Sequence, residues 1–172
     1  MKATPANAEA VQALHGILHE ELLRPGDALG VVEAWLSTNL AQNWALEDRA
    51  ENYFTAGRYE DADRAISALL SRMTISASNR AALLAISVAN DLVAGKAAGV
   101  SAKLVRLETF VTTQPDTFSV NWLFFGTRAA LRGTGNLKPT QRSELLALIS
   151  ALEKPRKSDV LAGIKTARNS LP

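Results

Sequence analysis

The stretch RAENYFTAGRYEDADRAI, residues 49–66, predicts two helices joined by a tight turn. Gly57 separates two helix-favouring segments, and glycine readily takes the left-handed conformation that closes a helix. Two acidic residues open the second segment, where the helix dipole favours negative side chains. The small residues Ala50 and Ala62 would let the two helices approach closely. The stretch therefore predicts an antiparallel helical hairpin.

Helical periodicity continues on both sides of this hairpin. Apolar residues recur at spacings of about three and four, proline and glycine separate the segments, and no alternating β-branched run is bounded by hairpin turns. We expect about nine helices, over residues 5–24, 27–40, 43–57, 59–73, 78–93, 101–115, 118–131 and 138–152, and from 158 onward. The segment 118–131 is apolar nearly all round, which predicts the central buried helix. The expected fold is all-α, a single domain of antiparallel hairpins over 1–172, built as an α-solenoid or a compact helical bundle.

The composition limits the function classes. Of the 172 residues, 47% are hydrophobic and 21% are charged, which is typical of a folded chain and excludes disorder. The absence of cysteine excludes disulfides, thiolate metal sites and a cysteine nucleophile, and it fits the cytoplasmic location that we predict. No stretch approaches the roughly 18 apolar residues of a membrane span, so we expect no membrane insertion.

Charge is distributed unevenly along the chain. Residues 1–86 hold 7 Lys/Arg and 11 Asp/Glu, a net −4, whereas residues 87–172 hold 12 and 6, a net +6, which together give the overall +2. This asymmetry would steer a charged partner or allow homo-oligomers to form head to tail, and it also arises by chance on a solvated surface. The alternative function that it suggests is nucleic-acid binding by the basic C-terminal half. Aromatic residues for base stacking are missing from 126–172, so we do not expect nucleic acid as the main partner.

The hairpin around Gly57 resembles a tetratricopeptide repeat, most clearly over 43–70 and again over 119–133. In the first segment, the small, aromatic and turn positions of the repeat correspond to Ala50, Tyr53, Gly57, Tyr59, Ala62 and Ile66. In the second segment they correspond to Trp122, Phe125, Gly126 and Gly133. The hairpin expected between them, about 77–115, matches less well, because Gly95 is displaced from the turn position that we assigned.

The resemblance implies a concave groove, lined by the first helix of each hairpin, that binds a peptide or partner helix. In the first repeat the matching positions are Trp44, Glu47, Glu51, Phe54 and Thr55. This mixture of aromatic and acidic side chains suits a peptide with Lys or Arg beside an apolar anchor. In the second repeat the positions are Val120, Leu123, Thr127, Ala130 and Leu131, for which we expect burial under the C-terminal helix. We predict a non-enzymatic protein–protein interaction module, an adaptor, chaperone or scaffold.

His15 and His19 are the only histidines, and their four-residue spacing puts both rings on one helical face. A catalytic zinc ion needs a third protein ligand, which no second cluster supplies, so we interpret both as surface histidines and predict no metal or cofactor. No nucleophile motif or phosphate-binding glycine loop occurs, and we predict no catalytic residue. The carboxylates of 47–63 alternate with arginines, which indicates exposed ion pairs.

Overall fold

The structure is a computed structural model that describes residues 5–38, 43–72 and 74–172. This part of the chain contains helices and no strand, so the predicted all-α fold is confirmed. The elements are α1 (Pro5–Gly16), η1 (Ile17–Glu21, a π-helical turn), α2 (Pro25–Thr38), α3 (Asn43–Thr55), α4 (Tyr59–Leu70), α5 (Ala77–Val93), α6 (Ala97–Thr112), α7 (Phe125–Gly133), α8 (Pro139–Leu152) and α9 (Lys157–Ser170). Of the helices described, none combines the length and the apolar character needed to cross a bilayer.

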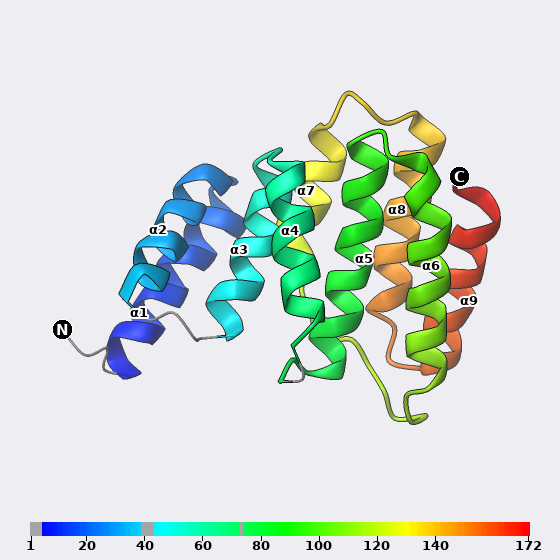
Figure 1. The fold of residues 1–172 in the computed structure, drawn as a ribbon, viewed down its shortest axis with the longest axis horizontal. Coiled ribbons are helices and arrows are strands. Elements are labelled where there is room, and N and C mark those ends of the chain that lie inside the picture. The colour runs from blue at the N-terminus through cyan, green and yellow to red at the C-terminus, as the bar shows by residue number, and fades with distance from the viewer. Residues whose placement is uncertain (1–4, 39–42, 73) are drawn as a thin grey trace.

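The first six helices stand side by side as three consecutive pairs, as Figure 1 shows. Two of the pairs close with the same turn. Gly57 and Gly95 have φ of +76° and +75°. The next residue donates its backbone N–H back into the preceding helix in each case, from Arg58 to Tyr53 O at 2.8 Å and from Lys96 to Asp91 O at 2.7 Å. From the sequence we expected Gly95 to be displaced from the turn position. Instead, Gly95 forms the turn of an equivalent hairpin 38 residues after Gly57.

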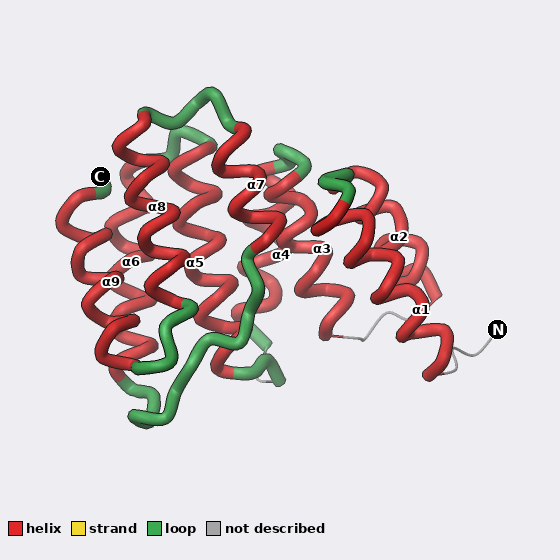
Figure 2. Tube along the Cα trace, turned by 180° about the vertical axis from the view of Figure 1, so that it is seen from behind, coloured by secondary structure: helices red, strands yellow, loops and turns green. Residues whose placement is uncertain are grey.

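After α6 the chain doubles back along this array. A long loop runs along the molecule from the end of α6 to the start of α7, and α7 packs on α3 (Figure 2). α8 then packs on α7 and α5, and α9 packs on α8 and α6. The last three helices thus form a second layer over α3, α5 and α6, and this layer occupies the face where the resemblance implied an open groove.

The helix predicted over 118–131 is wrong in its first half, because residues 118–124 are not helical, whereas residues 125–131 belong to α7. Phe118, Val120 and Phe124 are buried, while Asn121 and Leu123 are exposed. This alternation at even positions suits an extended segment, whose successive side chains point to opposite sides. The loop is also held in place by Asn121, whose backbone N–H donates to Ser78 Oγ at 2.7 Å.

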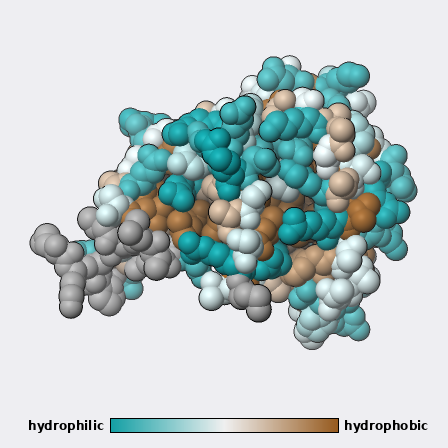
Figure 3. Space-filling view, viewed as in Figure 1, coloured by the Kyte–Doolittle hydropathy of each residue, from teal (hydrophilic) through white to brown (hydrophobic). Residues whose placement is uncertain are grey.

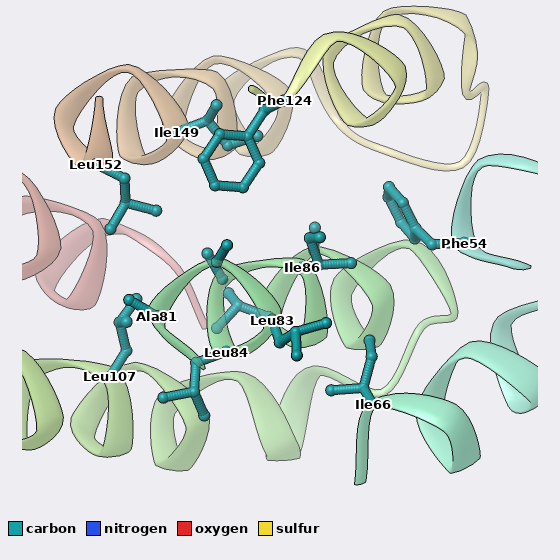
Figure 4. Packing of buried hydrophobic residues seen from close by; sticks show 14 of the residues in the cluster. Phe54, Ile66, Ala81, Leu83, Leu84, Ile86, Leu107, Phe124, Ile149 and Leu152 are labelled. Atoms are coloured by element: carbon teal, nitrogen blue, oxygen red, sulfur yellow. The ribbon is translucent and has the colours of Figure 1, made fainter. Parts of the chain in front are cut away.

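The central buried helix is α5 instead. Every side chain from Ala81 to Val93 is buried, and Figure 4 shows Leu83, Leu84 and Ile86 facing side chains from the neighbouring helices. Small residues such as Ala85 and Ala89 let several helices approach α5 at once. The prediction of the central helix failed because alanine is only weakly hydrophobic, so an alanine-rich helix does not stand out in the sequence even where it is fully buried.

Three predicted boundaries also change. The first helix does not run to Arg24 but ends at Gly16, and η1 follows it. The sixth begins at Ala97 rather than Ser101, because Gly95 already closes the helix before it. The fifth is capped by Ser76 rather than by Ser78 or Asn79, since Ser76 Oγ accepts the Asn79 N–H at 3.1 Å. Residues 39 and 40 of the second expected helix and residue 73 of the fourth lie outside the described residues.

Candidate functional site

Polar side chains are buried together where α1, η1 and α7 meet α3. On α3, Asp48, Glu51, Asn52 and Thr55 follow a helical spacing of three and four residues, so they share one face. This spacing was visible in the sequence and could have indicated a polar contact inside the protein. We missed it because the carboxylates were interpreted as exposed ion pairs, which holds for Asp61 with its arginine neighbours but not for these residues.

His15 is buried against this face, contrary to the surface position that we predicted. Its exposed fraction is 6%, and its ring stacks on that of His19 with the centroids 5.3 Å apart. Asn52 Nδ2 donates to His15 Nε2 at 2.7 Å, and His15 Nδ1 lies 3.4 Å from Asp48 Oδ2. A ring that accepts at Nε2 carries its proton on Nδ1, so this geometry selects the neutral tautomer. Burial also lowers the pKa of His15.

His19 is enclosed more completely, with 3% of its surface exposed. Its Nε2 lies 3.1 Å from Thr55 Oγ1, and Thr55 donates its hydroxyl to Asn52 O at 3.2 Å. Thr55 therefore accepts from His19, and no proton of Thr55 is aimed at a base. Burial, with a smaller effect of the charge of His15, lowers the pKa of His19 to about 4. Both imidazoles are neutral near pH 7.

Gly126 explains how α7 approaches so closely. An added Cβ at this position would lie 2.2 Å from His19 Cε1, so only glycine fits against the ring. The next residue, Thr127, donates its backbone N–H to Glu51 Oε1 at 3.2 Å, and its hydroxyl donates to the same oxygen. Glu51 thus accepts hydrogen bonds from the first turn of α7. At a helix N-terminus, unpaired N–H groups and the helix dipole both favour a carboxylate.

The carboxyl groups of this cluster have raised pKa values. Burial raises the pKa of Glu51 to about 7, although the hydrogen bonds from Thr127 act in the opposite direction. Burial raises the pKa of Asp48 to about 8, and the charges of Glu51, Glu47 and Glu20 add to this. The cluster therefore holds protons near pH 7 that exposed carboxyls would have released.

The five residues predicted to bind a partner are placed differently from the expected groove. Glu47 is buried and accepts from Asn79 Nδ2 at 2.6 Å. Glu51 is buried under α7, and Phe54, 2% exposed, belongs to the core. Trp44 is half-buried beside Trp35, and Thr55 is half-buried against His19. In the second predicted set, Val120, Thr127 and Leu131 are buried, but α7 packs on α3 and α8 rather than under the C-terminal helix that we expected to cover it, and Leu123 is 63% exposed.

A pocket opens beside this cluster. It has a volume of ≈ 170 Å³ and is lined by His19, Leu23, Pro25, Thr55, Gly126, Ala129 and Ala130. Three of these residues lie on α7, and the others come from η1, the loop after it, and the ends of α2 and α3. Leu23 reaches this position through a φ of +51°, which turns the chain sharply between η1 and α2.

Exposed apolar side chains surround the same junction. We call this set the apolar rim; its members are Leu14, Ile17, Leu22, Leu23, Leu123 and Phe125. They come from two segments that the contact between His19 and Gly126 brings together. Six of the seven exposed large apolar side chains in the described chain belong to the rim, and the seventh is Val105 on α6. On the face shown in Figure 3, by contrast, hydrophilic residues predominate over α4, α5 and α6.

Some basic residues of the C-terminal half form ion pairs or hydrogen bonds within the protein. Arg128 pairs with Glu153, and Arg168 pairs with Glu108 at 2.6 Å. Lys157 donates to two backbone carbonyls at the end of α6, those of Thr112 and Gln114. These three basic side chains therefore help to attach α8 and α9 to the rest of the fold.

The chemistry available to the buried cluster is limited by its own hydrogen bonds. Both ring nitrogens of His15 have partners, and the Thr55 hydroxyl donates to a carbonyl rather than to His19. Within the described residues, no three His, Asp or Glu side chains converge in a way that could hold a metal ion. A scan against protein-family models finds no match, and searches of curated proteins and of solved structures return no similar chain.

Proposed function

We propose that this chain is a non-enzymatic protein-binding module, an adaptor, chaperone or scaffold, whose partner docks on the apolar rim. The observation that carries the proposal is the concentration of exposed apolar side chains at one junction, where η1 meets the start of α7. Contiguous apolar surface costs solvation free energy in water, and such patches mark protein interaction sites. One member of the rim, Leu23, also lines a pocket, which provides the shape that a specific contact needs.

The rim replaces the concave groove that the sequence led us to expect. Because α7 lies on α3, a partner could reach Glu51 only after α7 had moved away. The paired helices and the equivalent turns at Gly57 and Gly95 support a further proposal, that α3–α4 and α5–α6 are tetratricopeptide-like hairpins. We also propose a cytoplasmic location, with which the cysteine-free composition is compatible.

A capture experiment tests the docking surface. The purified full chain is used as bait in a lysate of the cells that produce it, beside Leu22→Glu, Phe125→Glu and Val105→Glu. These positions are 53%, 50% and 45% exposed, so each substitution adds a charge to a similarly accessible apolar site. We expect a protein captured by the wild type and by Val105→Glu to be lost with both rim variants. The same protein captured equally by all four baits would overturn the proposal.

A further inference from the structure

We infer that the partner inserts one apolar side chain, of leucine or phenylalanine size, into the pocket beside His19 and places a Lys or Arg against Glu20 and Glu21. This inference rests on the proposed docking at the apolar rim and specifies its chemistry. The pocket volume of ≈ 170 Å³ sets the size of the anchor. An apolar cavity of roughly 150 Å³ accommodates benzene, so this pocket holds one phenyl ring or one branched aliphatic group.

The walls of the pocket favour an uncharged occupant. Gly126, Ala129 and Ala130 form an apolar surface on the α7 side. The two polar atoms His19 Nε2 and Thr55 Oγ1 are hydrogen-bonded to each other at 3.1 Å, so neither of these atoms requires a polar group from a ligand. The imidazole is neutral near pH 7, because burial lowers its pKa to about 4. An apolar side chain therefore enters without breaking the hydrogen bond between His19 and Thr55.

The charges beside the pocket select a basic partner. Glu20 and Glu21 are exposed on η1, and neither forms an ion pair within the described part of the chain. The adjacent cations are already engaged: Arg24 pairs with Asp27 at 2.5 Å, and Arg128 pairs with a glutamate of α8–α9. The pKa of Glu20 is raised, chiefly by its partial burial and then by the negative charge of Glu21. A Lys or Arg at this position would relieve the repulsion.

The same charges argue against a second copy of this chain as the occupant. A two-fold contact from rim to rim would bring two pairs of Glu20 and Glu21 together, and like charges at an interface are costly. A head-to-tail contact would place the rim on the basic half. Outside the rim, the one exposed large apolar side chain among the described residues of 87–172 is Val105, and valine is smaller than the leucine or phenylalanine for which the pocket has room. The geometry therefore favours a different protein.

A peptide selection tests the inference directly. Random dodecapeptides displayed on phage are selected on the immobilised full chain, and the enriched peptides are synthesised and titrated. Ala129→Leu fills the pocket from α7, and Glu20→Lys with Glu21→Lys reverses the charge of η1. The matched control is Glu9→Lys with Glu60→Lys, which makes the same change of net charge at two other exposed positions. Circular dichroism establishes that each variant keeps its helicity.

We expect enriched peptides to combine one Phe or Leu with a nearby Lys or Arg. The affinity of these peptides should fall at least about tenfold with Ala129→Leu. It should also fall about tenfold with the charge reversal on η1, and this second loss should be smaller in high salt. The control pair should leave the affinity unchanged. Enriched peptides without a basic residue, or peptides that bind Ala129→Leu normally, would overturn the inference, as would an empty selection. The exposed charge variants keep the test decisive if Ala129→Leu fails to fold. The capture experiment is independent: loss of a protein on the rim variants would preserve the proposed function after any of these failures.

Discussion

Replacing Gly126 with alanine tests how tightly η1 and α7 meet. The new Cβ would lie 2.2 Å from Cε1 and 2.3 Å from Nε2 of His19, far inside the contact distance of about 3.5 Å. The ring cannot easily yield, because it is almost completely buried and hydrogen-bonded to Thr55. The substitution must therefore separate α7 from η1 or break the bond between His19 and Thr55.

The cost follows from two opposing effects. Forcing an extra carbon into a packed contact costs about 1–3 kcal/mol, whereas replacing glycine with alanine in a helix returns at most about 1 kcal/mol. We expect the free energy of unfolding to fall by about 1–2 kcal/mol for Gly126→Ala. For a chain of this size, each kcal/mol lowers Tm by about 2–4 °C. Gly133→Ala, at the other end of α7, has no atom within 4 Å of its added Cβ and should change stability by less than about 0.5 kcal/mol.

Urea unfolding followed by circular dichroism measures both variants against the wild type. Wild-type stability for Gly126→Ala would refute the close approach of α7 to His19. An equal loss in Gly133→Ala would also refute it, since a general intolerance of α7 to alanine would then explain both results. Restored stability in the double variant His19→Ala with Gly126→Ala would identify the ring as the obstacle.

Three further predictions concern stability. The pKa of Glu51 and that of Asp48 are raised in the folded state to about 7 and about 8. Their stabilisation is therefore complete below their ordinary pKa values of 4.5 and 3.8, is lost progressively as pH rises from there through about 7 and 8, and is gone above these values. Between pH 6.5 and 8.5, the free energy of unfolding measured in urea should fall on the order of 1 kcal/mol per pH unit, and Glu51→Gln should make this fall smaller. A free energy of unfolding that does not change over this range would contradict the raised pKa values. In the same assay, Gly163→Ala should lower the free energy of unfolding by about 1–3 kcal/mol, because the added Cβ would lie 2.0 Å from the Cβ of Ala151. Unchanged stability would show that α8 and α9 do not approach this closely. Lys103→Met should cost about 2–3 kcal/mol in thermal unfolding, because it removes the cation 2.8 Å from the carboxylate of a buried aspartate on α5, and a loss below about 0.5 kcal/mol would show that the pair contributes little.

Local features of the fold could be predicted from the sequence. Gly57 between two periodic segments correctly indicated the α3–α4 hairpin, because a positive φ at a helix end is a local requirement that glycine meets. The start of α8 at Pro139 was equally visible. Features that depend on distant contacts were not. Residues 118–124 form an extended segment because their even positions pack against the array, and their apolar character alone resembles that of a buried helix.

The candidate site was missed for the same reason. The hydrogen bond between Glu51 and Thr127 joins residues 76 positions apart, and that between His15 and Asn52 joins residues 37 positions apart. Two histidines four residues apart on one helix can be either exposed or buried if only the sequence is known. Their burial follows from the packing against α3, which is distant in the sequence. The polar face of α3, with Asp48 and Asn52, was present in the sequence, but only the arrival of α7 turns it from a solvated face into a buried one.

The return of α7, α8 and α9 along the first six helices has a consequence for how this architecture can change in length. In an open array each pair contacts only its neighbours, so pairs can be added or removed, and one end can melt while the other persists. Here α9 closes on α6, and α7 reaches back to α3, so the elements in between are held from both ends of the sequence. Insertion of another hairpin would change the distance that the loop before α7 must span. The contacts between the layers therefore fix the number of helical pairs and couple the unfolding of the early helices to that of the late ones.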